Sequence, residues 1–412
     1  MEKLLKLIVY LIIFVTPLLG FTSIGYEQTK VVFFIGALVL EILLWFVYWL
    51  IKRPVTKIQL SPINIVSSLF ILVLLLTSYT GVNFVKSMVG GYPYLQGWFL
   101  YLALFSFSLL ILQLKINLKI VSYLITFSAL FVSLKAILDF ILMTFFYQNI
   151  PNYSDRVVST FGQPDFYAGF LLLTLPFQIA GQPKKWKIFR LICLVMTLIA
   201  IEVSTSRTAI FLALAYFIVL FVRCFRYRIR KIIFPLCAVT VILVGILSIN
   251  LHFGPLWTEL DYPPRIDYFF HDFPVRGFYF WQFRWSANPE KRIYIWPVVG
   301  DLIVRRPILG YGLENLETVF PTADLAQFHG IKNLTVDRSH NYTLDLLFFS
   351  GFLGFLVWLL LVILMFRRVR SGSILSALVL YLIWIQFQNQ SVVELIFFWM
   401  LEGLINIDNI GN

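Results

Sequence analysis

Three polar residues stand where long apolar runs of the sequence begin, and their types suit transfer of a charged group. Arg207 follows Ser206 between two apolar runs, Arg292 opens the stretch RIYIWP, and His340 precedes Asn341 ahead of another apolar run. A guanidinium binds phosphate through two parallel hydrogen bonds. A neutral imidazole can take a proton from an attacking hydroxyl. Such residue types are candidates for binding a phosphate group and for moving a proton.

A second polar stretch, DRVVSTFGQPDFYAGF (155–170), precedes a further apolar run. Arg156 adds another guanidinium, and Gln163 and Asp165 interrupt the apolar pattern. Asp165 has two interpretations, which both stay open. It is either a residue at a helix start, stabilised by the helix dipole, or a functional carboxylate.

No motif in the sequence predicts a metal or a cofactor. The four histidines and three cysteines do not have the spacing of metal ligands or of a disulfide framework. Walker A, dinucleotide-binding and Gly-x-Ser-x-Gly motifs are also missing from the sequence. We therefore expect chemistry without metal or cofactor, and an ATP-driven pump would need a separate motor chain.

The elements that position these residues must lie in a membrane. Of the 412 residues 60% are hydrophobic and only 13% charged, about half the charged share of soluble proteins, which excludes a soluble globular enzyme. A spanning helix needs about 20 apolar residues. The sequence predicts an all-α polytopic membrane protein with about twelve spans: 7–22, 31–51, 63–80, 98–114, 120–146, 161–180, 191–206, 208–222, 232–250, 342–366, 373–388 and 392–407.

The basic residues predict how these spans are oriented. Nineteen of the 33 Lys and Arg lie in alternate connections, whereas the short connections on the other side hold Lys30, Lys86, Arg156 and Arg207. This bias predicts that both termini are cytoplasmic. The net charge of +12 is then a topology signal and no footprint of nucleic acid. Arg207 stands on the disfavoured side, either to bind phosphate or to reach lipid headgroups as a snorkelling side chain. His340 is likewise either a base or an interfacial histidine bonded to the backbone.

One long connection, about 251–340, is predicted to lie outside between spans 9 and 10. It is rich in Trp, Tyr and Phe, which is typical of a cap at headgroup level. Residues 291–308 show helical apolar spacing and predict an amphipathic helix ending before Pro307, followed by a tight turn at Gly310, Tyr311 and Gly312. The predicted division is a membrane bundle at 1–250, the loop domain at 251–340, and C-terminal spans at 341–412.

Four outer segments in this order make the chain resemble the O-antigen ligase and polymerase superfamily of bacterial membrane enzymes. They are STFGQPDFYAGFLLLTLP (159–176), STSRTAIF (204–211), RIYIWPVVGDLIVRRPILGYGLENLETVF (292–320) and RSHNYTLDLLFFSGFLGFL (338–356). One departure is Gln163-Pro164-Asp165, where the family commonly has Asn-Pro-Asn.

The resemblance implies a membrane fold like that of C-type glycosyltransferases in the bacterial cytoplasmic membrane. The implied reaction moves a glycan from undecaprenyl diphosphate to a hydroxyl of a glycan, lipid or protein at the outer face, without a metal. Arg207 and Arg292 would stabilise the diphosphate leaving group, and His340 would orient or deprotonate the acceptor. The implied substrate-binding residues are Arg156, Gln163, Asp165, Ser206, Tyr311 and Asn341.

Three other functions stay open. A polymerase of the same superfamily differs from a ligase only in its acceptor, and the His-Asn and Ser-Arg pairs favour the ligase. A transporter of lipid-linked saccharides would place charges deep within several spans, whereas here polar residues gather at the outer edge. The third alternative is a scaffold without catalytic activity.

Overall fold

The computed structural model describes residues 1–20, 23–52, 61–146, 150–153, 156–179, 186–226, 292–323 and 336–410. Most of these residues are helical. The chain packs as two compact units, one formed by residues 1–125 with 289–412 and the other by residues 126–288. The predicted division into 1–250, 251–340 and 341–412 follows membrane topology instead of packing, and it stays a prediction.

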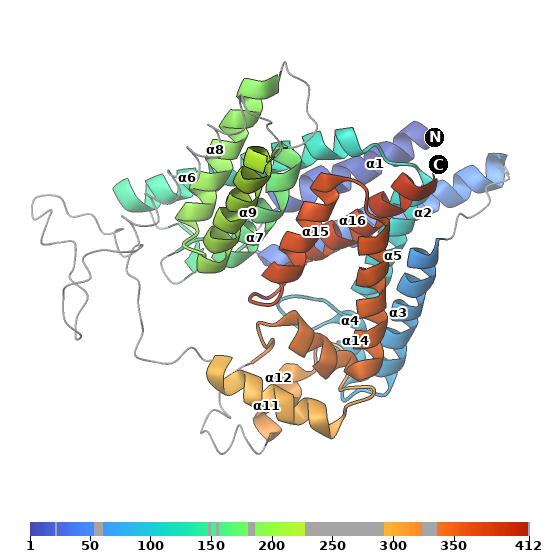
Figure 1. Ribbon diagram of the computed structural model, residues 1–412. Coiled ribbons are helices and arrows are strands. Elements are labelled where there is room, and N and C mark those ends of the chain that lie inside the picture. Colours follow the sequence, from blue (N-terminus) through green and yellow to red (C-terminus); the bar gives the residue numbers. More distant parts are fainter. Residues whose placement is uncertain are drawn as a thin grey trace, which may run out of the picture. The chain divides into compact units, whose positions relative to one another are not determined.

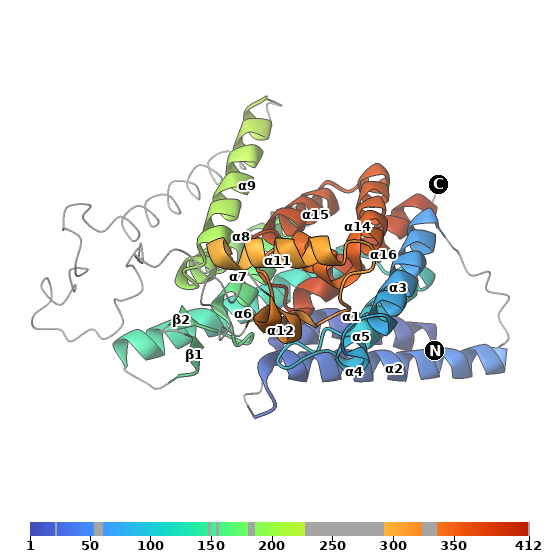
Figure 2. The ribbon, with the colours of Figure 1, turned by 90° about the horizontal axis from the view of Figure 1, so that it is seen from below.

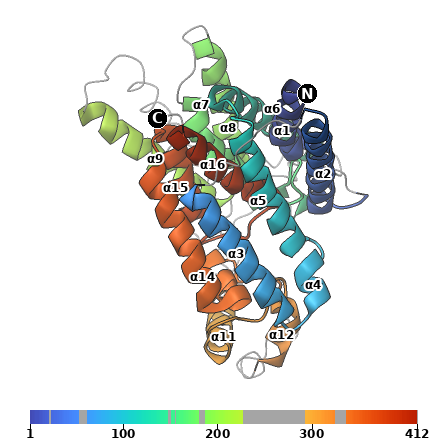
Figure 3. The same cartoon turned by 90° about the vertical axis from the view of Figure 1, so that its right-hand side faces the viewer.

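The first unit contains most of the described helices (Figure 1). They are α1 (Glu2–Val15), α2 (Tyr26–Lys52), α3 (Pro62–Tyr79), α4 (Phe84–Val89), α5 (Trp98–Gln113), α11 (Arg292–Arg305), α12 (Leu316–Val319), α14 (Tyr342–Arg368), α15 (Gly372–Trp384) and α16 (Val392–Ile410), with 3-10 turns η1 (Thr16–Leu18) and η5 (Phe320–Thr322). Helix α6 (Leu118–Phe145) continues from this unit into the next one. Within the first unit α3 packs along α14, and α5 packs along α16 (Figure 3).

The second unit holds three further helices, coloured green in Figure 1. They are α7 (Pro164–Ile179), α8 (Lys187–Val203) and α9 (Arg207–Arg226), and they pack on one another. The short strands β1 (Asn152–Tyr153) and β2 (Arg156–Val157) pair antiparallel, with Tyr153 opposite Arg156.

The all-α membrane class is confirmed, because eleven of the twelve predicted spans overlap a helix. The ninth, 232–250, lies outside the described residues. By length and hydropathy, four described helices can cross a membrane, namely Tyr26–Ile51, Pro62–Tyr79, Leu118–Phe145 and Tyr342–Arg368. Large apolar side chains such as Leu43, Phe46 and Leu50 of α2 are exposed, as expected of a face that meets lipid. The number of spans and the outer position of the long loop stay predictions.

Helix α14 is broken at Gly351 (φ 61°, ψ −168°), in the half that follows its N-cap. At a break the carbonyls before it and the N–H groups after it lose their helical partners, and within a membrane these groups must be satisfied inside the protein. Residues 307–312 supply the partners. The hydrogen bonds are Tyr311 N–H to Phe348 O (2.8 Å), Gly312 N–H to Phe349 O (2.9 Å), Phe352 N–H to Pro307 O (2.7 Å) and Leu353 N–H to Ile308 O (3.3 Å).

Two predictions for the segment before this break are confirmed. The predicted amphipathic helix is α11, which buries Val298 and Leu302, exposes the charged Arg305 and packs on α14 (Figure 2). The predicted tight turn follows it, with φ of 65° at Gly310 and 85° at Gly312. A Cβ on Gly310 would lie 2.4 Å from Phe348 O, so the close approach to α14 requires glycine.

Candidate functional site

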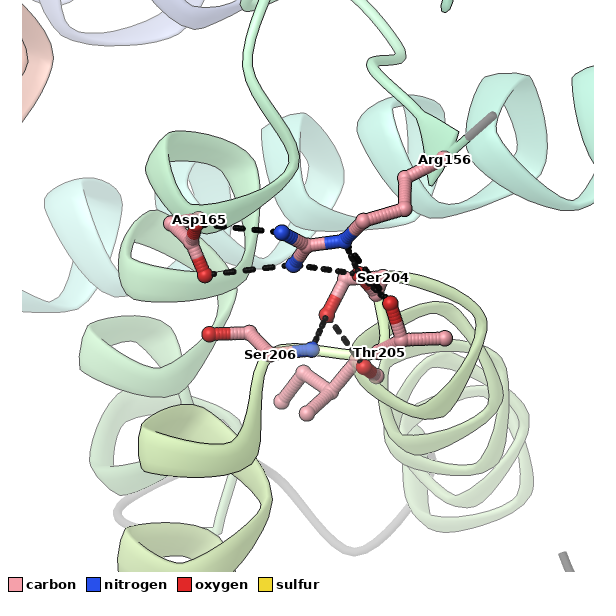
Figure 4. A network of polar contacts seen from close by, with 6 residues as sticks. Arg156, Asp165, Ser204, Thr205 and Ser206 are labelled. Atoms are coloured by element: carbon pink, nitrogen blue, oxygen red, sulfur yellow. Dashed lines mark hydrogen bonds and ion pairs between the residues drawn. The ribbon is translucent and has the colours of Figure 1, made fainter. Parts of the chain in front are cut away.

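In the second unit Arg156 ties the start of α7 to the corner between α8 and α9 (Figure 4). Its Nη1 and Nη2 face the Asp165 carboxylate at 3.4 and 3.3 Å. Nη2 also donates to Ser204 O at 2.8 Å, and Nε donates to Thr205 Oγ1 at 2.8 Å. The two charged side chains are largely buried, with 26% and 16% of their surface exposed. This guanidinium is therefore engaged mainly by the protein's own acceptors.

The corner that Arg156 contacts has an uncommon backbone. Helix α8 ends at Val203, and Thr205 has a φ of 54°, a left-handed conformation that is rare for a β-branched residue. Ser204 stabilises the corner from within, because its Oγ donates to Ile201 O at 2.5 Å and accepts from Ser206 N–H at 3.0 Å. Backbone strain of this kind persists only where the surroundings enforce it, and it is common at functional sites.

Arg207, the predicted phosphate ligand, is the first residue of α9 and is exposed. The first turn of α9 contains no acidic residue, so the cation adds to the partial positive charge of the helix N-terminus. Ser206 just before it is 1% exposed, and its Oγ has no hydrogen-bond partner among the described residues. The α9 start is thus a place where an anion would be stabilised.

Asp165 and Gln163 lie at the start of α7. Asp165 is in the first turn, which agrees with its interpretation as a helix-start residue, and its ion pair with Arg156 adds a second function for the same carboxylate. Gln163 is half-buried and comes just before Pro164, the first residue of the helix. The contacts of Asp165 are compatible with both of the interpretations left open by the sequence.

In the first unit His340 and Asn341 form the corner that leads into α14. His340 has a φ of 60° and is half-buried. Asn341 is the N-cap, with its Oδ1 accepting from Leu344 N–H at 3.1 Å. Ser339 closes the turn, because its Oγ donates to Asn341 O at 2.8 Å and accepts from Asn341 N–H at 3.2 Å. His340 is therefore presented by a turn that is bonded on both sides of it.

Arg292 and Tyr311 are both associated with α11. Arg292 is its first residue, and Tyr311 follows the helix and bonds back to it. Arg292 is half-buried, one helical turn before Trp296 on the same face. Trp296 Nε1 donates to Ser339 O at 2.9 Å, which links this face of α11 to the residue before His340. Tyr311 is buried, stacks on Phe348 at 4.6 Å and donates its hydroxyl to Leu302 O at 3.1 Å. These contacts give Tyr311 a packing role, and its predicted contact with substrate stays a prediction.

Arg338, to which the sequence reasoning assigned no role, is a buried junction just before the His-Asn pair. Its guanidinium forms an ion pair with Glu314 and donates to Gln96 Oε1 at 3.1 Å. It also lies over the rings of Tyr94 and Phe349, 5.6 and 5.0 Å from their centroids. This cation thereby joins the connection between α4 and α5, the connection between α11 and α12, and the segment before α14.

Electrostatics keep this junction charged on the arginine side. Burial lowers the pKa of Arg338, but the carboxylates of Glu314 and Asp345 outweigh this effect and raise the pKa above its ordinary value. Burial raises the pKa of Glu314, which Arg338 opposes without cancelling. One sequence signal was available, because Arg338 is an arginine on the predicted outer side, as Arg207 is. Gln96 gives no such signal.

The predicted site residues thus fall into two groups, each described within its own unit. Arg156, Asp165, Ser206 and Arg207 gather around the α8–α9 corner, with Gln163 in the sequence next to them. Arg292, Tyr311, His340 and Asn341 belong to the first unit. Among the described residues no three His, Cys, Asp or Glu side chains are grouped as metal ligands, and metal independence stays a prediction.

The apolar helices, with polar corners at their ends, define an all-α membrane protein with candidate sites at helix starts. Residues 192–359 match the family described as O-antigen ligase. The resemblance to the O-antigen ligase and polymerase superfamily is therefore confirmed over these residues. They include Arg207, Arg292 and His340, whereas Arg156 and Asp165 precede the matched part. A comparison with curated proteins finds no match.

Proposed function

We propose that the protein is a glycosyltransferase of the O-antigen ligase type. It moves a glycan from undecaprenyl diphosphate to an acceptor hydroxyl at the outer face of the bacterial cytoplasmic membrane. The main support is the start of α9, where an exposed Arg207 and a buried Ser206 hydroxyl lie within the part of the chain that matches the family. The proposal requires neither a metal nor a nucleotide sugar.

The leaving group explains why arginines would be needed. Breaking the anomeric C–O bond releases a diphosphate, and its developing charge is stabilised best by donors that are already in place. Arg207 and the α9 N-terminus supply such positive charge, and Ser206 adds a hydroxyl. Arg292 is the second cation in the proposal. His340 accepts the proton of the attacking hydroxyl, for which a half-buried imidazole at a fixed turn is suited.

Transfer by the purified protein in detergent micelles is the decisive measurement. The donor is the undecaprenyl-diphosphate-linked glycan extracted from host membranes, and the product is released undecaprenyl diphosphate, quantified by mass spectrometry. We expect Arg207→Ala and His340→Ala to lower kcat about 10²- to 10³-fold, the usual cost of losing a charge-stabilising donor or a general base. Added EDTA should leave the wild-type rate unchanged.

The matched control is Arg367→Ala, which removes an exposed arginine from the other end of α14 and should retain wild-type transfer. A transporter moves the lipid-linked saccharide intact and breaks no anomeric C–O bond, so it would release no undecaprenyl diphosphate in this assay. Wild-type rates in Arg207→Ala or His340→Ala would contradict the catalytic assignment. Supplying either a core glycolipid or a second lipid-linked unit as acceptor would distinguish the ligase from the polymerase.

A further inference from the structure

We propose that Arg338 is a positioning residue that holds His340 in place for transfer. The inference rests on the proposed function, in which His340 accepts the proton of the acceptor hydroxyl. It assigns a role to a buried ion pair that does not itself reach the substrate.

Arg338 is fixed on several sides. Its side chain is 8% exposed and that of Glu314 is 5% exposed. Gln96, which accepts from the guanidinium, donates in turn from Nε2 to Gln390 O at 2.7 Å. With the rings of Tyr94 and Phe349 against the cation, a guanidinium held in this way has little freedom to move.

The residues that follow Arg338 are anchored as well, up to the turn at His340. Ser339 donates its N–H to Asp345 Oδ1 at 2.8 Å and accepts from Trp296 Nε1 at 2.9 Å. Asn341, on the other side of His340, caps α14. His340 thus lies between anchored neighbours, and this explains how it keeps a φ of 60°, which costs free energy in a residue other than glycine.

A buried ion pair such as Arg338–Glu314 is not explained by stability alone. Transferring two charged side chains out of water costs about as much free energy as their attraction returns. Replacing such a pair by apolar side chains is therefore often neutral for the stability of the fold. Removing only one partner leaves an uncompensated charge and is destabilising. A double replacement can therefore separate positioning from stability.

The experiment compares Arg338→Met/Glu314→Met with Lys86→Met/Glu317→Met in the transfer assay described above. Lys86 and Glu317 form an ion pair at 2.7 Å that links the residues after Glu314 to α4, and the described hydrogen bond of this pair does not involve residues 338–341. Melting temperature, kcat and KM for the donor are measured for both. We expect the control to melt near the wild type and the first variant somewhat below it, because Gln96 Oε1 loses its donor, with both folded at the assay temperature. Only the first should lose kcat, by about 10- to 100-fold, the effect of a small misplacement, with an unchanged KM.

Arg338→Lys provides a second route if the first double variant does not fold. It keeps the charge but loses the planar group that meets Glu314, Gln96 and the rings together, so kcat should fall while KM does not. A wild-type kcat in a folded Arg338 variant overturns the inference. So does a kcat loss that merely follows the folded fraction, or full activity of His340→Ala. The proposed function fails separately, if the wild type itself performs no transfer.

Discussion

The arginines of the candidate site differ in what surrounds them, and this difference separates their expected roles. Arg156 is bonded to Asp165, Ser204 O and Thr205 Oγ1, so most of its donors already have acceptors. Arg207 is exposed at a helix start. The contacts of Arg156 favour holding the α8–α9 corner over direct contact with phosphate, whereas the position of Arg207 favours contact with an anion.

Arg156→Lys tests this distinction. An ammonium cannot serve Asp165 and the corner in the same fixed geometry, so we expect a loss of about 1–3 kcal/mol in the free energy of unfolding. Chemical denaturation of the purified protein measures it. Arg190→Lys is the matched control in the same unit and should be near neutral, because within the described part of the chain Arg190 has a single hydrogen bond, of 3.5 Å to Ile179 O. Equal effects of the two substitutions would contradict the positioning role of Arg156.

At this scale the sequence predicts where polar residues gather but not which of them contact each other. Asp165 was recognisable as a helix-start residue because it follows Pro164 at the end of a polar stretch. Its ion pair with Arg156 depends on how β2 and α7 meet, which no local pattern encodes. Gln96 illustrates the same limit, because its partner Arg338 lies far away in the sequence.

The break in α14 is the main feature at the scale of elements. The run 342–366 is predominantly apolar and predicts one continuous span. Gly351 does not predict the break, because glycine is common in membrane helices. The turn at residues 310–312 was predictable from its glycines. Its insertion into the hydrogen bonding of α14 was not, because that depends on a helix later in the chain.

Gly351→Ala should therefore be destabilising by about 2 kcal/mol or more. The residue adopts a backbone conformation that is almost restricted to glycine, and an added Cβ would lie 2.2 Å from Ile308 O. Denaturation in detergent gives the change in unfolding free energy. Gly372→Ala, where no atom lies within 4 Å of the added Cβ, should change stability little. Similar stability of the two variants would mean that the break tolerates side chains.

For the whole molecule, the basic residues predict the membrane topology more directly than hydropathy predicts the number of spans. Only four described helices reach full spanning length and hydropathy, although eleven predicted spans overlap helices. Several of the other helices that overlap predicted spans are shorter, with 16 residues in α5, 17 in α8 and 13 in α15. Hydropathy alone therefore places the helices well and their boundaries less well.

Topology can be tested by cysteine labelling after replacing Cys193, Cys224 and Cys237 with alanine. Tyr92→Cys, at a side chain that is 77% exposed, should react with an impermeant maleimide in intact spheroplasts. Lys119→Cys, at an exposed position before the fifth predicted span, should react only after lysis. The reverse pattern would invert the predicted orientation and place both termini outside.

The hydrogen bonds between residues 307–312 and the two halves of α14 also limit how the long loop can be exchanged between related enzymes. A graft of the whole segment 251–340 would place residues 307–312 of one enzyme against the broken α14 of another. The backbones of the two segments would then need to match at Gly310, Gly312 and Gly351. Chimeras made to transplant acceptor choice should keep residues 307–312 and α14 from one parent. Their downstream junctions therefore belong before Pro307, upstream of the part of the loop that completes the helix.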